Sequence, residues 1–289
     1  EIWNEPDQEG FWPPKPDPRH YVALARETCV AIKRRVPNAF VTGPAAAQMP
    51  TVWRPEKPLM QALLNDKALL TCLDALSLHT HRFGQTPETV SRDYAILRKN
   101  YLDAWPSAIP RKPIIDTEWG DSVYLSGISE KTQALWLPRM ILTNLMEQVD
   151  LTNWYCLMDT GDNDNEMEDR FGLVRSDETM RPSFQAYQTL AREIGGMSLR
   201  ETIARFDPAT ARGITILRFC DEAEQQCKLA VWTTEADERS QKVVVSGWRK
   251  SGPAIDYLGR EDVSQPNTNG VLELLPRTSV TYVPITVAR

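Results

Sequence analysis

The chain of 289 residues is 42% hydrophobic and 25% charged, a composition that supplies a core for one large globular domain or two ordinary ones. Its net charge is -6, from 33 basic and 39 acidic residues, which argues against a nucleic-acid partner. The sequence contains no run of about 18 apolar residues, so no membrane-spanning segment is expected.

The first six residues combine a hydrophobic approach with an amide, a carboxylate and a proline. Ile2 and Trp3 are typical of a strand, and Pro6 is typical of its end. A strand that ends in this way would deliver Asn4 and Glu5 into a cleft. The tripeptide Asn-Glu-Pro alone is weak evidence for a site. A solvated loop carboxylate is the simpler reading of Glu5 until a second strand-end carboxylate is found.

Strand-like and helix-like segments alternate from residue 1 to about residue 194. The five expected strands lie near residues 1–4, 39–43, 74–80, 113–118 and 151–157. The expected helices lie near residues 18–36, 57–70, 87–104, 129–149 and 182–194. This alternation predicts an α/β fold with a parallel sheet and helical crossovers. Each strand is apolar enough to be covered on both faces.

Short alternating runs replace the helical periodicity after Gly196. They lie at residues 213–219, 228–233, 242–245, 271–275 and 279–285, with turn residues between them. This pattern predicts a small antiparallel β-sandwich. We therefore expect two domains, a barrel-like portion at residues 1–195 and the sandwich at residues 196–289.

The five cysteines show no metal-ligand spacing. Cys220 and Cys227 flank a polar, hairpin-like loop and could face each other as a disulfide, above all in an exported protein. A periplasmic or secreted location is favoured for the chain. The other three cysteines lie in apolar stretches and are expected to be buried thiols, namely Cys29, Cys72 and Cys156.

Glu118 is the second carboxylate at a strand end. Ile114 and Ile115 precede it, Gly120 turns the chain away, and it lies 118 − 5 = 113 residues after Glu5 with two expected strands between them. In a β/α barrel the strand ends meet at one rim, where the active site lies. Two carboxylates at that rim are the minimum for acid/base and nucleophilic chemistry at a glycosidic bond. A structural ion pair is the alternative role for Glu118.

Two motifs carry a family resemblance: Glu-Ile-Trp-Asn-Glu-Pro-Asp at residues 1–7, followed by Phe-Trp at 11–12, and Ile-Ile-Asp-Thr-Glu-Trp-Gly at 114–120. They resemble clan A of the glycoside hydrolases, and family 39 most within it. The resemblance implies a (β/α)8 TIM barrel whose fourth strand ends at the acid/base, here Glu5. The seventh strand would end at the nucleophile, here Glu118. A C-terminal sandwich is also usual in such enzymes.

The resemblance also implies the reaction. A retaining glycosidase cleaves a poly- or oligosaccharide, such as a bacterial exopolysaccharide, by double displacement through Glu118 and Glu5. Asn4 would donate a hydrogen bond to the sugar 2-hydroxyl. Trp154, in the last strand, would form the floor on which the sugar stacks, although a core role is the alternative. We expect no cofactor and no metal.

His79 and His81 lie two residues apart near a strand end, so both point to one face. The preferred interpretation is that they line the sugar site. One of them could instead be a satisfied core histidine. A metal site is disfavoured, because the sequence offers no third ligand beside them. Many clan members have a tyrosine that touches the nucleophile where this chain has His81, so the group that orients Glu118 stays open.

The acidic run at residues 159–169 superficially suggests calcium. An EF-hand loop that begins at Asp162 needs glycine at position 6 and glutamate at position 12, whereas Met167 and Leu173 occupy those positions. We therefore prefer a solvated loop at the rim, one that discriminates substrate charge.

A closed barrel needs eight strands, and five are visible. If the opening segment is the fourth strand, the first three are absent, and such strands would be required to complete the barrel. The chain is then the C-terminal portion of a longer enzyme. Two alternatives stay open for its function: an inactive or carbohydrate-binding fragment, and a family 5-like cellulase.

Overall fold

The computed structural model describes residues 1–47, 58–103, 105–235, 242–265 and 272–287. The chain forms two compact units, which are described separately. Unit 1 comprises Glu1–Arg82, Val90–Trp119 and Glu147–Tyr155. Unit 2 comprises Phe83–Thr89, Gly120–Met146 and Cys156–Arg289. The predicted division after residue 195 stays a prediction.

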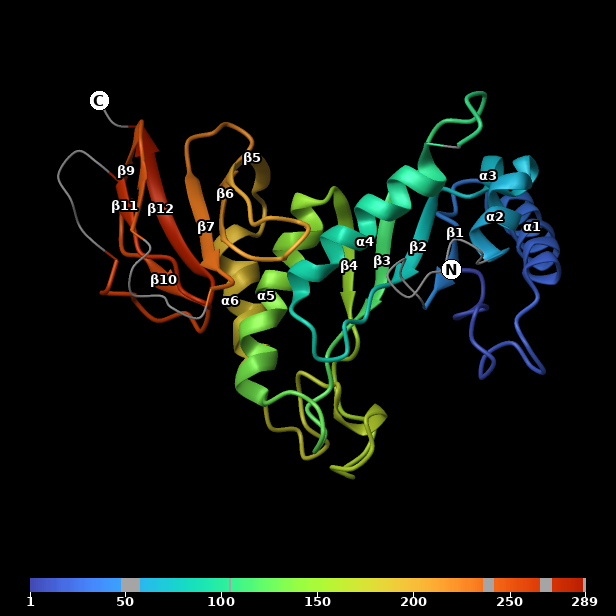
Figure 1. The fold of residues 1–289 in the computed structure, drawn as a ribbon, viewed down its shortest axis with the longest axis horizontal. Helices are drawn as coiled ribbons and strands as arrows, with labels where there is room; N and C mark the ends of the chain where they lie inside the picture. The colour runs from blue at the N-terminus through green and yellow to red at the C-terminus, as the bar shows by residue number, and fades with distance from the viewer. Residues whose placement is uncertain (48–57, 104, 236–241, 266–271, 288–289) are drawn as a thin grey trace. The chain divides into compact units, whose positions relative to one another are not determined.

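Unit 1 contains a parallel sheet of four strands in sequence order (Figure 1): β1 (Thr42–Ala46), β2 (Ala75–His79), β3 (Ile114–Trp119) and β4 (Val149–Trp154). Every residue of β1 and β2 is buried, as expected of strands covered on both faces. The predicted parallel sheet is therefore confirmed. Among the described residues this sheet does not close on itself, and the eight-stranded barrel stays a prediction.

The expected strand at residues 39–43 lies three residues later in the chain than predicted. Gly43 and Pro44 are inside β1, and the pairing of β1 with β2 is irregular between Pro44 and Ala46. Such an irregularity is where a sheet tolerates proline. A Cβ at position 43 would lie 2.7 Å from the hydroxyl of the buried Tyr21, so any larger residue there would force Tyr21 to shift.

The opening segment is not a regular strand, contrary to the expectation for residues 1–4. It nevertheless lies beside β1, because the Ile2 amide donates to the Thr42 carbonyl at 2.9 Å and the Glu5 amide donates to the Ala45 carbonyl at 3.1 Å. Trp3 and Glu5 have left-handed φ values of 67° and 44°, which a strand cannot accommodate.

Helical segments precede and connect the strands of unit 1. They are α1 (Pro18–Arg35), α2 (Pro58–Asn65), α3 (Lys67–Cys72), α4 (Val90–Leu97) and the π-helical turn η2 (Arg98–Leu102). Asp17 caps α1, since its carboxylate accepts the Arg19 and His20 amides. The helix expected at 57–70 is two helices, because Asp66 stops α2 and caps α3 by accepting the Leu69 amide at 2.9 Å.

The observed disulfides differ in part from those predicted from the sequence. Cys29 in α1 and Cys72 in α3 form a disulfide, although both were expected to be thiols. The two helices pack together, which brings residues 43 positions apart into contact. The expected bond between Cys220 and Cys227 is present, and these residues pair in register. Cys156, in the loop after β4, is a half-buried free thiol.

The described residues of unit 2 form two helices, two antiparallel sheets and two short 3-10 turns. The helical segments are α5 (Glu130–Met146), α6 (Pro182–Ile194), η1 (Pro87–Thr89) and η3 (Glu168–Arg170). The larger sheet has the order β10-β12-β7-β6-β5, with β9 paired to β12, and the smaller sheet pairs β11 with β8. Their strands are β5 (Ser198–Ala204), β6 (Ile214–Cys220), β7 (Cys227–Thr233), β8 (Val243–Val245), β9 (Trp248–Lys250), β10 (Ile255–Asp256), β11 (Leu272–Leu274) and β12 (Thr281–Val287).

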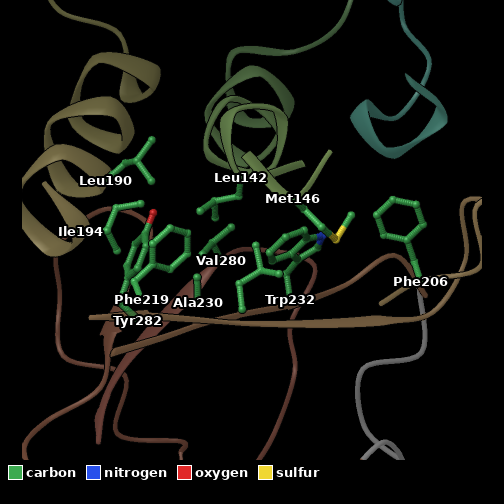
Figure 2. Packing of buried hydrophobic residues seen from close by; sticks show 11 residues of the cluster. Leu142, Met146, Leu190, Ile194, Phe206, Phe219, Ala230, Trp232, Val280 and Tyr282 are labelled. Atoms are coloured by element: carbon green, nitrogen blue, oxygen red, sulfur yellow. The ribbon is translucent and has the colours of Figure 1, made fainter. Parts of the chain in front are cut away.

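Both faces of the larger sheet are covered. Figure 2 shows Leu142 and Leu190, from α5 and α6, packed against sheet residues that include Trp232 and Tyr282. A second buried cluster joins the larger sheet to β8 and β11. The predicted antiparallel strands are therefore confirmed. Helices were not expected on one face, and the exposed edge strand β5 was missed because its sequence is largely polar.

No helix among the described residues is long and apolar enough to cross a membrane, as expected from the hydropathy of the sequence.

The Cys29–Cys72 disulfide should stabilise unit 1. Replacing both cysteines by alanine is expected to lower the free energy of unfolding by about 4 kcal/mol, because the bond closes a long loop of the unfolded chain. Removing Cys220–Cys227, whose loop is only seven residues, should cost about 2 kcal/mol. Hydrogen exchange of α1 and β6, measured in denaturant, separates the two effects. Equal protection of α1 with and without the first bond would contradict this expectation.

Candidate active site

Glu5 is held in position by the strained opening segment. Its amide is bonded to Ala45, and the buried side chains of Ile2 and Pro6 anchor the chain on either side. A non-glycine residue with φ near 44° costs free energy, and such strain is concentrated at functional sites. Asn4, directly before Glu5, is half-buried.

His79 ends β2 and is almost completely buried, with 1% of its side chain exposed. Its Nδ1 lies 2.8 Å from Glu5 Oε1 and 3.7 Å from Glu118 Oε2. The register of the sheet explains the second contact, since His79 pairs with Glu118 across β2 and β3. His79 therefore joins the two carboxylates identified from sequence. It is closer to a buried, satisfied histidine than to one that lines an open site.

His81 holds the second carboxylate. Its Nε2 lies 3.1 Å from Glu118 Oε1, and its ring meets Tyr155 edge-on with centroids 6.3 Å apart. His81, at the position where many clan members have a tyrosine, thus contacts Glu118, and its role in orienting Glu118 stays a prediction.

Glu1 belongs to the same cluster, and sequence reasoning missed it. Glu1 Oε1 lies 3.8 Å from His79 Nε2, and Glu1 Oε2 accepts a hydrogen bond from the Thr117 hydroxyl at 2.5 Å. A signal for it was present: residues four apart in an extended segment share a face, which would place Glu1 on the side of Glu5.

The carboxylates around His79 control its protonation. Burial alone would lower the pKa of His79, but its hydrogen bonds to Glu1 and Glu5 and the charges of Glu118 and Glu5 outweigh burial and raise that pKa to about 10. Burial would likewise raise the pKa of Glu1, yet hydrogen bonds from His79 and Thr117 lower it. At neutral pH the site therefore contains an imidazolium among three carboxyl groups.

The cluster also has the donor set of a metal site. One nitrogen of His79 and one oxygen from each of Glu5 and Glu118 lie within 4.8 Å of one another, which supplies the third ligand that the sequence did not reveal. A divalent ion bound there would have to displace the His79 proton, because an imidazole ligand is neutral. The cluster could therefore hold an ion only if His79 lost its proton.

The tryptophans of unit 1 differ in exposure. Trp119 is completely buried and packs in the core, whereas Trp3 is half exposed. Trp154 ends β4, pairs with Trp119 in register and is half-buried. A half-buried ring keeps open the predicted role of a stacking floor for a sugar.

The acidic run at 159–169 belongs to unit 2. Asp159 is buried, and its carboxylate accepts two hydrogen bonds from Arg181, both at 2.7 Å, and one from the Gly172 amide at 2.8 Å. Arg170 pairs with Asp164 in the same run. Protein donors thus occupy the carboxylates of Asp159 and Asp164, and most of the run lies at the surface.

Comparisons with known proteins identify the fold. No protein-family model matches the chain, and no curated protein matches it. Among solved structures it is similar to a family 39 glycoside hydrolase from the gut symbiont Bacteroides cellulosilyticus WH2, with a TM-score of 0.72, 22% identity and coverage of 98% of this chain and 57% of that one.

Two other similar structures belong to different families. The α-L-arabinofuranosidase from Thermotoga maritima has a TM-score of 0.61 at 15% identity, over 94% of this chain and 62% of that one. The family 44 xyloglucanase from Paenibacillus polymyxa has a TM-score of 0.60 at 11% identity, over 98% of this chain and 65% of that one. The resemblance to clan A glycoside hydrolases, with family 39 among them, is confirmed for the fold. The chain spans 57–65% of the length of these structures.

The raised pKa of His79 predicts a pH dependence of stability. His79 stays protonated in the folded state up to about pH 10, whereas the unfolded chain releases this proton near pH 6.5. Stability from His79 is therefore complete below pH 6.5 and lost as pH rises to about 10, by at most about 1.4 kcal/mol per pH unit.

Urea unfolding at several pH values, followed by circular dichroism, measures this loss. The difference in stability between wild type and His79→Gln should shrink from pH 6.5 toward pH 10, while other titrating groups cancel in the difference. A constant difference would show that His79 is neutral in the folded protein.

Proposed function

We propose that the chain is a retaining glycoside hydrolase that acts on a poly- or oligosaccharide, with Glu5 as acid/base and Glu118 as nucleophile. One observation carries the proposal: an oxygen of Glu5 and an oxygen of Glu118 lie within 4.8 Å of each other. Retaining enzymes place their carboxyl groups about 5–5.5 Å apart, and inverting enzymes about 6.5–9.5 Å apart. The similarity of the fold to glycoside hydrolases supports the same class.

The reaction proceeds in two displacements. The Glu118 carboxylate attacks the anomeric carbon while Glu5 gives its proton to the leaving oxygen, and the glycosidic bond breaks. Water then attacks the glycosyl ester on Glu118 as Glu5 takes a proton from that water, which releases the sugar and restores both carboxyl groups. Asn4 would donate to the 2-hydroxyl, and Trp154 would support the sugar ring.

His79 and His81 position the two carboxyl groups. His79 holds its proton far more tightly than a carboxylic acid does, so it orients Glu5 and leaves the transfer of the proton to Glu5. His81 holds Glu118 through the oxygen opposite to the one that faces His79. These contacts to its two different oxygens fix the orientation of the Glu118 carboxylate for attack on the anomeric carbon.

A carbohydrate-binding or inactive fragment is the second candidate. The open sheet of the described residues and the partial coverage of the similar structures favour it. Further strands would then be needed for turnover. A family 5-like cellulase differs only in substrate. The two disulfides favour an oxidising compartment such as the periplasm or the cell exterior.

Glu118→Gln should lower kcat/KM by a factor on the order of 10³ or more, because the amide cannot form the glycosyl ester. The assay uses aryl glycosides, including arabinofuranosides and xyloglucan-derived oligosaccharides, together with bacterial exopolysaccharides. Glu27→Gln, on the exposed surface of α1, is the matched control and should leave activity unchanged.

Proton NMR of the first-formed product tests the stereochemistry. Retention of the anomeric configuration is expected, and inversion would reject the double displacement. Full activity of Glu118→Gln would reject the assignment of the nucleophile.

The contact between His81 and Glu118 predicts a graded effect on activity. His81→Phe removes a hydrogen bond to a charged group and should lower kcat about 10- to 100-fold. His81→Tyr keeps a donor at this place and should recover much of the loss. The pH profile of kcat should shift at its acid limb in His81→Phe. A loss of the same size in both variants, with an unaltered profile, would indicate that His81 only packs.

A further inference from the structure

Glu1 is the third carboxylate of the cluster around His79, and the proposed reaction gives it no step. Its Oε1 lies 3.8 Å from His79 Nε2, and its side chain is 28% exposed. Glu5 and Glu118 face the other ring nitrogen, Nδ1, at 2.8 and 3.7 Å. Glu1 is therefore the carboxylate that faces Nε2, on a different edge of the ring from the two groups assigned to the reaction.

Glu1 is itself held in place by the strands beside it. Its Oε2 accepts the Thr117 hydroxyl of β3 at 2.5 Å. The backbone of the next residue, Ile2, is fixed at both ends: its amide donates to the Thr42 carbonyl at 2.9 Å, and its carbonyl accepts the Tyr21 hydroxyl at 3.2 Å. The Glu1 carboxylate therefore presents a fixed acceptor to the imidazole ring.

Carboxylates on both nitrogens decide which form of His79 fits the site. An ionised carboxylate only accepts hydrogen bonds, and a neutral imidazole has a single N–H to donate. A neutral His79 would leave Glu1 or Glu5 facing a nitrogen lone pair. The arrangement thus favours the imidazolium with an N–H on each side, and Glu1 supplies the acceptor for the second N–H.

The same contact restrains the direction of the ring. Nδ1 lies between two carboxylates, closer to Glu5 than to Glu118. A half turn of the ring would exchange its nitrogens with carbons and lose the contacts at both edges. A small rotation would move Nδ1 from Glu5 toward Glu118. An anchor at Nε2 opposes both movements, and Glu1 occupies that position.

We propose that Glu1 is a positioning residue for the acid/base: it holds the His79 ring so that Nδ1 stays on Glu5. Thr117 holds Glu1 in turn, so that a chain of contacts from β3 ends at Glu5. No bond to Glu1 forms or breaks, because Glu5 alone exchanges a proton with the leaving oxygen. The proposal rests on the proposed function for the role of Glu5. A salt bridge that only stabilises the fold is the competing role for Glu1.

Steady-state kinetics separate the two roles. Glu1→Gln keeps the size of the side chain and removes its charge, so kcat should fall about tenfold or more while KM stays within about twofold. Glu1→Asp keeps the charge and should recover part of kcat. Glu9→Gln, an exposed carboxylate in the same loop, is the matched control and should change neither constant. Urea unfolding of each variant shows that it is folded.

A double-mutant cycle tests whether Glu1 acts through His79. In a His79→Gln chain, Glu1→Gln should cause little further loss of kcat, since the ring that Glu1 positions is gone. An undiminished effect of Glu1→Gln in that chain would overturn the proposal. A kcat equal to that of wild type in Glu1→Gln alone would overturn it as well.

Proton NMR of isotope-labelled protein tests the contact without any substrate. The chain has three histidines, so His79→Gln assigns the ring N–H signals of His79. Wild type should show two of them at neutral pH. In Glu1→Gln the Nε2–H signal should move upfield or disappear, because a neutral amide accepts more weakly than a carboxylate. An unaltered Nε2–H signal would overturn the proposal.

Failure of the proposed function is separately visible. If wild type hydrolyses no glycoside and the Nε2–H signal still depends on Glu1, the placement of the His79 ring by Glu1 stands and the hydrolase does not. If hydrolysis depends on Glu118 but kcat does not depend on Glu1, the hydrolase stands and the positioning role falls.

Discussion

The unit that contains the candidate active site depends on one buried histidine among three carboxyl groups. Oxygens of Glu5 and Glu118 lie within 4.8 Å of each other, so negative charge on both side chains at once would be repulsive. The imidazolium of His79 offsets this repulsion, and it does so for carboxyl groups from two separate segments of the chain, the opening segment and β3. The opening segment has only two backbone hydrogen bonds to β1, so His79 and Thr117 are a large part of what holds Glu1 and Glu5 beside the sheet.

The two carboxylates, the alternation of strands and helices, and the change to antiparallel strands could be predicted from sequence because each depends on a local pattern. Glu118 follows an apolar run, and Glu5 follows a strand-like one. The contacts between them could not be predicted, since they depend on the register of β2 against β3. The left-handed backbone at Trp3 and Glu5 is incompatible with the regular strand that was predicted there. The Cys29–Cys72 bond could not be predicted, because it depends on how α1 packs on α3.

The acidic run shows how one stretch of like charge can divide into two roles. Asp159 is neutralised by Arg181 and fixes the base of the loop, a buried pairing that composition alone cannot distinguish from a metal ligand. The carboxylates farther along stay at the surface and give the loop its negative field, which roughly 0.1 M salt screens beyond about 10 Å. Asp159 thus has a structural role at the base of the loop, whereas the later carboxylates supply its surface charge.

The Cys29–Cys72 bond also bears on the integrity of the chain. It encloses residues 30–71, a span that includes β1. A protease that cuts one peptide bond within that span leaves the two pieces covalently joined, so β1 stays attached to the opening segment on one side or to α3 and β2 on the other. This bond would therefore keep a chain that is cleaved once within the span in one covalent piece.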